Sequence, residues 1–191
     1  YALCNPSVGF VLKHEGHSLV KAPGVEDIQN KIASVYGVGI AKELLPVNFE
    51  NEFVKISGYI SKPHLARNDK NQQALFVNRR WVRNSAVTNA VGDGYHSLLF
   101  VGKHPVFALF LEINPEKVDV NVHPQKLEIK IEQQKEISSA VSLAVREALA
   151  SHNLIPVVDF SFAETPSTPK YEFEQSTQTV LNTRSEVKGD E

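Results

Sequence analysis

Methionine is absent from the 191 residues, and cysteine occurs only once, as Cys4. Because even position 1 is not methionine, we expect the polypeptide to continue upstream. A single cysteine excludes an internal disulfide and a cysteine-rich zinc site. No signal peptide is visible, and no apolar run approaches the roughly 20 residues of a membrane helix. We therefore expect an intracellular protein, from the cytoplasm of a prokaryote or the nucleus of a eukaryote, with no membrane partner.

Neither sign of charge dominates the chain, since 20 Lys and Arg oppose 22 Asp and Glu for a net charge of −2. This balance argues against a uniformly basic nucleic-acid binder. The length suits one domain of ordinary size plus a tail. Residues 157–191 hold seven acidic and three basic residues among many Ser and Thr. We predict one folded domain over residues 1–155 and a flexible acidic linker over residues 156–191.

Hydrophobic periodicity predicts interleaved strands and helices. Alternation typical of strands covers residues 7–13, 18–21, 52–61, 73–78, 118–122 and 127–131, and the apolar run 105–113 is typical of a central strand. Helical spacing covers residues 25–35, 87–98 and 137–148, the second with Asn84 as its expected N-cap. The order ββα-ββ-α-βββ-α predicts an α/β (α+β) two-layer sandwich, in which a mixed β-sheet carries helices on one face.

Three glycines fall inside these predicted elements. Gly58 interrupts a strand pattern, which indicates a bulge or a close approach of another backbone. Gly92 and Gly94 lie in a helix pattern, where each costs about 1 kcal/mol relative to alanine. We expect that helix to be weakened or kinked.

A single lysine lies between the two strand patterns of residues 118–131. Pro124 cannot donate to a ladder and breaks the pairing, so Lys126 falls at the mouth of a loop. A rigid loop that presents one ammonium group suits a phosphate, although on spacing alone a solvated lysine is the simpler interpretation. Asp119, Asn121 and His123 would share one strand face over about 13 Å, which is too far for one small ion. We expect these three side chains to hold the lysine loop by hydrogen bonds to neighbouring backbone, with Pro124 as a further structural support, and we predict no metal site.

Basic residues concentrate between Lys62 and Arg83, where six Lys or Arg are opposed only by Asp69. Those that could form a phosphate-binding stripe are Arg67, Lys70, Arg79, Arg80 and Arg83, the last three placed around Trp81. A solvated charged face fits the same residues equally well. The sequence alone leaves both interpretations open.

Four blocks of sequence resemble one known family. Residues 119–126, Asp-Val-Asn-Val-His-Pro-Gln-Lys, resemble the signature of the MutL family of DNA mismatch repair proteins. Residues 36–47, 56–63 and 75–80 match the family in order and spacing, and the resemblance covers roughly residues 5–150. It implies the transducer domain of a GHKL ATPase, the C-terminal part of the N-terminal ATPase region, with a left-handed crossover in its fold.

The resemblance assigns a role to Lys126. In the MutL family a separate upstream domain of the gyrase type binds ATP with Mg²⁺, and the transducer contributes one lysine to the γ-phosphate. Lys126 occupies the matching position. The chain itself has no glycine-rich Walker loop. We therefore expect it to be no enzyme on its own but part of an ATPase in the complete protein.

The resemblance also implies binding to DNA and to other proteins. Family members bind the DNA backbone without sequence specificity, which predicts a steep dependence on salt. The implied protein partners are the upstream ATPase domain, a MutS-type mismatch sensor, a second MutL-type subunit and a downstream nuclease or helicase. The chain departs from many members in two places, because Arg79 replaces a turn glycine and Ser85 stands where some members carry arginine.

Two other functions remain as alternatives. The first is the transducer of another GHKL ATPase, such as a type II topoisomerase or a chaperone. The context Asn121-His123-Pro124 and the absence of a Gln-Thr-Lys-type loop argue against it. The second is a stand-alone nucleic-acid-binding module. It predicts that nucleotide leaves the DNA affinity of the full protein unchanged.

Overall fold

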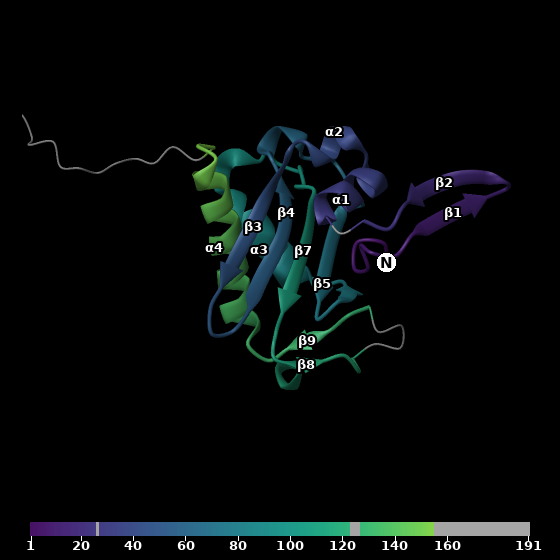
Figure 1. Cartoon of the computed structure of the whole chain (residues 1–191). Helices are drawn as coiled ribbons and strands as arrows, with labels where there is room; N and C mark the ends of the chain where they lie inside the picture. Colours follow the sequence, from purple (N-terminus) through teal and green to yellow (C-terminus); the bar gives the residue numbers. More distant parts are fainter. Residues whose placement is uncertain (26, 123–126, 155–191) are drawn as a thin grey trace, which may run out of the picture. The chain divides into compact units, whose positions relative to one another are not determined.

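A five-stranded mixed sheet forms the centre of the computed structural model, which describes residues 1–25, 27–122 and 127–154 (Figure 1). The strands lie in the order β3-β4-β7-β5-β6. Their bounds are β3 Leu44–Glu50, β4 Lys55–Ser61, β5 Gln73–Val77, β6 Arg80–Val82 and β7 Phe107–Glu112. β7 is antiparallel to β4 but parallel to β5, so the chain crosses over from β5 to β7 through β6 and helix α3, Ser85–Tyr95. The predicted α/β class with a mixed sheet is confirmed.

The apolar run predicted as a central strand is β7, which pairs on both sides. Its residues alternate between two hydrophobic clusters, with Phe107 and Leu109 in one and Ala108 in the other. Gly58 of the neighbouring strand β4 has φ of 132°, and a Cβ there would lie 2.1 Å from the carbonyl oxygen of Ala108. The predicted close approach at Gly58 is therefore confirmed.

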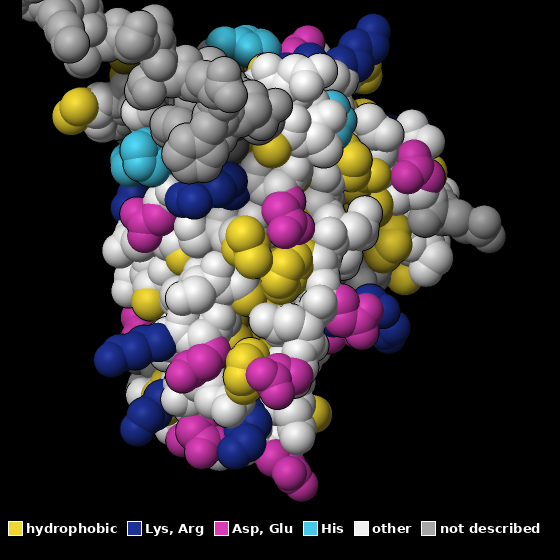
Figure 2. All heavy atoms as spheres, turned by 90° about the vertical axis from the view of Figure 1, so that its left-hand side faces the viewer, with side chains coloured by type: hydrophobic (Ala, Val, Ile, Leu, Met, Phe, Trp, Pro, Cys, Tyr) yellow, Lys and Arg dark blue, Asp and Glu magenta, His cyan; other side chains and the backbone are white. Residues whose placement is uncertain are grey.

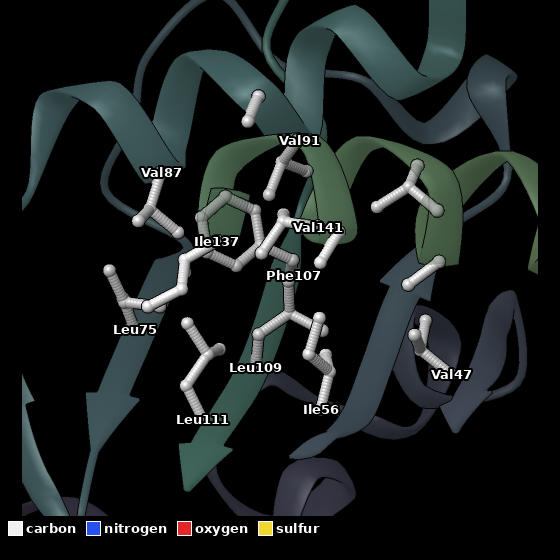
Figure 3. Packing of buried hydrophobic residues seen from close by; sticks show 14 of the residues in the cluster. Val47, Ile56, Leu75, Val87, Val91, Phe107, Leu109, Leu111, Ile137 and Val141 are labelled. Carbon is white, nitrogen blue, oxygen red and sulfur yellow. The ribbon is translucent and has the colours of Figure 1, made fainter. Parts of the chain in front are cut away.

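Helices cover both faces of the sheet rather than one. α3 and α4, Gln134–Ser151, pack over the face that carries Phe107 and Leu109 (Figure 3). On the opposite face α1, Ile28–Tyr36, and α2, Val38–Ala41, contribute Ile32 and Ile40 to a second cluster with Ala108. The prediction of helices on one face only is thus wrong for α1 and α2. The small and aromatic residues of that second face are themselves apolar and need a cover.

The helix ends follow the polar residues that precede them. Asn84 caps α3, as predicted, because its Oδ1 accepts a hydrogen bond of 3.0 Å from the backbone N–H of Val87. Asp27 caps α1 in the same way, through Gln29 and Asn30. α3 ends at Tyr95, and a 3-10 turn, His96–Leu98, completes the segment that the sequence predicted as helix.

Two strands, β3 and β6, were not predicted. β3 is an edge strand, where Pro46 is tolerated because the missing N–H costs no central hydrogen bond. β6 has only three residues after a two-residue turn, too few for a periodic pattern. β4 begins later than predicted because the side chain of Asn51 accepts from the N–H groups of Phe53 and Val54, which makes a turn there.

The predicted N-terminal hairpin is confirmed as β1, Phe10–His14, and β2, His17–Ala22. It extends away from the sheet, on the side of α1 (Figure 1). Its base is held by Lys31 of α1, a fully buried residue whose Nζ donates to the carbonyl oxygens of Val8 at 2.6 Å and Pro23 at 2.7 Å. These oxygens, with that of Ala22 at 3.3 Å, replace the hydration of the ammonium group.

The two strands predicted around the lysine loop are shorter than expected. They are β8, Val118–Asp119, and β9, Lys130–Ile131, which pair with each other outside the main sheet. β8 ends early because the Asp119 carboxylate accepts a 2.8 Å hydrogen bond from the backbone N–H of Asn121 and turns the chain.

The predicted linker, residues 156–191, lies outside the residues that the structure describes. The domain boundary at residue 155 therefore stays a prediction. Within the described residues, no helix combines the length and the apolar character that crossing a membrane requires.

Candidate functional site

The described residues before the lysine loop do not form the predicted continuous strand face. Asp119 ends β8 and bonds to the backbone of Asn121, which lies exposed in the following turn. The two side chains therefore do not share one face of a strand. His123, Pro124 and Lys126 lie outside the described residues, and their roles stay predictions.

The residues directly after the loop are held by the basic segment. The backbone N–H of Arg83 donates to the carbonyl oxygen of Leu127 at 2.6 Å, and Arg83 forms a parallel bridge with Glu128. This contact joins the end of the sheet edge strand β6 to the peptide that follows Lys126. No sequence pattern signals this contact, because it depends on how two distant segments pack.

Asn84 links the same region to both long helices. Besides capping α3, its Oδ1 accepts from Nε2 of Gln134 at 3.0 Å, and its Nδ2 donates to Oε1 of Gln134 at 3.3 Å. Gln134 is the first residue of α4, which follows β9. The starts of α3 and α4 are therefore joined beside residues 127–131.

Two of the predicted DNA-binding residues meet in one hollow. Lys70 and Arg83 line a cavity of about 450 Å³ together with Trp81, Asn71 and Asn84; we call it the basic hollow. The guanidinium carbon of Arg83 lies 5.3 Å from the centre of the Trp81 ring, a cation–π contact. Lys70 and Arg83 are both exposed, so the cations are accessible from solvent.

Arg79 and Arg80 lie at the other end of β5. β5 separates them from Lys70 by five residues, or about 16 Å at the rise of a strand. Arg79 lines a different hollow beside Glu112, and Arg80 lines a third with Val118. The structure therefore does not gather the predicted basic residues into one cluster.

The pairing of Arg67 with a second loop brings Lys103 to the region, which sequence reasoning missed. Its backbone pairs with His104 through two hydrogen bonds of 2.8 and 2.7 Å. Next to it, Nζ of Lys103 donates to Oδ1 of Asn68 at 2.6 Å. No sequence pattern signals this contact, because it depends on how two separate loops pack.

Lys62 belongs to the basic stretch, but Glu43 offsets its charge. Its Nζ lies 3.1 Å from Oε2 of Glu43, and this hydrogen bond holds the pKa of the Glu43 carboxyl below its ordinary value. No described acidic side chain forms such a pair with the five predicted DNA-binding residues.

The face that α4 presents in Figure 2 differs from this region. Cationic and anionic side chains lie among one another on it, so its described part carries no continuous basic surface. In the described part of the chain, His, Cys, Asp and Glu nowhere form a group of three that could hold a metal ion. The described site offers exposed cations beside an aromatic ring, a combination suited to phosphates and bases.

Comparisons with known proteins agree with one another. A family model described as "DNA mismatch repair protein, C-terminal domain" matches residues 32–150. The chain is 37% identical over 171 residues to the DNA mismatch repair protein MutL of Geobacillus sp. (strain WCH70), covering 90% of this chain and 28% of that protein. It is 36% identical over 175 residues to the MutL protein of Streptococcus mutans, covering 92% of this chain and 27% of that protein. The chain thus spans about a quarter of the length of these relatives.

A solved structure has a similar fold. The crystal structure of the N-terminal domain of a DNA repair protein superposes with a TM-score of 0.66 at 19% sequence identity. The match covers 81% of this chain and 49% of that one. At this identity the likeness concerns the fold alone.

Proposed function

The chain belongs to the MutL family of DNA mismatch repair proteins, and on this basis we propose that it acts in mismatch repair as the transducer domain of a longer ATPase. An upstream GHKL domain binds ATP with Mg²⁺, and Lys126 contacts the γ-phosphate. The chain has no catalytic activity alone. It completes the ATPase site and passes the state of the nucleotide to the DNA-binding surface.

The contact between Arg83 and Leu127 carries this proposal. Arg83 lines the basic hollow, and Leu127 directly follows the lysine. Because a backbone hydrogen bond of 2.6 Å joins them, a displacement of one segment would also shift the other. The candidate DNA contact Arg83 is thus hydrogen-bonded to the residue that directly follows the candidate nucleotide contact.

The chemistry of each part follows from its charge. An ammonium group aimed at the γ-phosphate stabilises the charge that spreads over its oxygens during transfer, provided that water is excluded. The Lys126 contact requires the γ-phosphate, which ATP has and ADP lacks. ATP therefore favours the conformation in which the contact exists. We propose that this conformation is the dimerised, DNA-bound one, recognised by a MutS-type sensor and by a downstream nuclease or helicase.

DNA binding requires no base recognition in this proposal. Lys70 and Arg83 contact phosphates, with Arg67, Arg79 and Arg80 as further contacts along the strand. Each phosphate contact releases counterions and makes the negative slope of log affinity against log salt steeper by about 0.9.

One set of proteins tests both halves, using the complete polypeptide with its upstream domain. Lys126→Ala should lower ATP turnover by about 100-fold, as for loss of one charge-stabilising group, with ATP binding retained. Lys130→Ala is the matched control, since Lys130 is an exposed lysine on β9. The double variant Lys70→Ala, Arg83→Ala should reduce the salt slope of DNA binding by about 2, with the ATP turnover in the absence of DNA unchanged.

Each half can fail on its own. Equal turnover in Lys126→Ala and Lys130→Ala would make Lys126 a surface residue and remove the nucleotide role. An unchanged salt slope in the double variant would remove the basic hollow as a DNA contact.

A further inference from the structure

Two apolar side chains stand exposed on the loop between α3 and β7. Phe100 is 84% exposed and Val101 is 104% exposed. The backbone N–H of Lys103 donates to the carbonyl oxygen of Phe100 at 3.0 Å, and Gly102 has φ of 76°, as in a type II turn. The turn has defined geometry, so we call Phe100 and Val101 the apolar tip.

The turn of the apolar tip is joined to the neighbouring loop that carries Arg67 and Lys70. Lys103 closes the turn, and its Nζ bonds to Asn68 at 2.6 Å. The backbone of His104 pairs with Arg67, so the tip is anchored on the polar loop that leads to Lys70. Residues 62–72 and 99–105 contain only one acidic residue, Asp69.

This combination fits one kind of occupant better than others. An apolar protein surface would need a larger patch than two side chains, because interface cores bury many residues. A polyanion with flat apolar faces satisfies both the cations and the aromatic ring. Nucleic-acid bases are such faces, and phosphates lie on either side of them.

We propose that Phe100 stacks on an unpaired DNA base, while Lys103, Arg67 and Lys70 contact the flanking phosphates. The inference rests on the DNA binding proposed above and adds to it a residue that contacts a base. In a duplex the bases already stack on one another, and inserting a ring between them costs unstacking energy. A single strand exposes its bases, so Phe100 adds affinity for single-stranded DNA and little for a duplex.

The test measures affinities of the full chain for oligothymidine and for a duplex of equal length, at several salt concentrations. Phe100→Ala should weaken binding to the single strand about tenfold, near the loss of one base–aromatic stack, and binding to the duplex less than about twofold. The salt slope should not change, since no phosphate contact is lost. Phe100→Trp should restore the affinity, whereas Phe100→Leu should not, because leucine is apolar but has no π face.

Val11→Ala is the matched control, because Val11 is 59% exposed on β1, in the hairpin that extends away from the sheet (Figure 1). It should bind both DNAs like the unaltered chain. Full affinity in Phe100→Leu, or an effect of Phe100→Ala below about twofold on the single strand, would overturn the inference and leave the tip to a protein partner.

The two proposals fail in different ways. If the unaltered chain binds neither DNA, or binds with no salt dependence, the proposed DNA function fails and the inference fails with it. If the chain binds DNA with a salt slope that Lys70→Ala, Arg83→Ala reduces, but Phe100 variants bind normally, only the inference fails.

Discussion

Asn78 and Arg79 form the two central positions of the β5–β6 hairpin, with φ of 48° and 66°. A two-residue turn with both φ angles positive suits the twist of the strands and favours Asn followed by Gly. The Asn78 side chain is fixed by two hydrogen bonds of 2.9 Å to the backbone of Ile113. Arginine at the second position holds the left-handed conformation against the steric preference of its Cβ.

Arg79→Gly should therefore raise the free energy of unfolding by about 1 kcal/mol, because relief of the left-handed conformation outweighs the added freedom of glycine in the unfolded chain. Urea denaturation measures this change. Arg79→Ala removes the same charge but keeps a Cβ, so it should give no gain. Equal stabilisation by Gly and Ala would show that charge, and not φ, is responsible.

Residue-level predictions succeeded where a local rule applied. The family resemblance singled out Arg79 as a side chain in a turn-glycine position, and its positive φ agrees with a turn there. The Asn84 cap follows equally from local chemistry. Lys31 was missed, because its three carbonyl partners come from the hairpin base and no pattern in the helix announces them.

At the scale of the element, α3 carries two glycines that the sequence could not tell apart. A Cβ on Gly94 would lie 2.6 Å from Cβ of Val145 and 2.8 Å from the carbonyl oxygen of Ser142, both on α4. A Cβ on Gly92 would meet nothing within 4 Å. Gly94 thus permits the close approach of the two helices, and Gly92 only weakens α3.

Gly94→Ala should lower the free energy of unfolding by about 1–3 kcal/mol, since the backbone oxygen of Ser142 cannot move aside without shifting α4. Gly92→Ala should instead stabilise by up to about 1 kcal/mol, through helix propensity. Thermal unfolding of the two variants side by side measures both effects. The same sign for both substitutions would contradict the packing argument.

The strands show the same division between local and long-range information. Periodicity predicted β4, β5 and β7, because the side chains of these strands alternate between the hydrophobic clusters on the two faces of the sheet. It missed β3 and β6, because an edge strand is defined by its partner as much as by its own residues. It overextended β8, where the single side chain of Asp119 overrides the alternation.

At the scale of the molecule, the sheet is shared by two apolar layers. β5 and β7 contribute side chains to both clusters, so neither layer can be lost while the other keeps its sheet. The MutL resemblance found in four motifs is confirmed by the comparisons. The hydrogen bond between Arg83 and Leu127 could not be predicted, because the two residues lie in different sequence segments that come together only in the fold.

Two phenols, the half-buried Tyr36 in one layer and the fully buried Tyr95 in the other, predict how this shared sheet responds to alkali. Burial raises the pKa of Tyr36 to about 12 and also raises the pKa of Tyr95, whose hydroxyl donates to the carbonyl oxygen of Ser61. In the unfolded chain tyrosine ionises near pH 10, while the folded phenols stay neutral. The unfolded state then binds fewer protons, so stability falls as the pH rises above about 10.

Tyr36→Phe and Tyr95→Phe should each make this fall shallower, by up to about 1.4 kcal/mol per pH unit. Tyr95→Phe should also be less stable at neutral pH by about 1–3 kcal/mol, because the buried carbonyl of Ser61 loses its donor. Urea midpoints between about pH 8 and pH 11, followed by far-UV circular dichroism and by fluorescence of Trp81, measure both effects.

Trp81 packs against the cluster of Tyr36, and α4 lies over the other face. The two signals should therefore report one transition at every pH. Separate midpoints would mean that the layers unfold independently, and unchanged slopes would mean that neither phenol stays neutral in the folded chain.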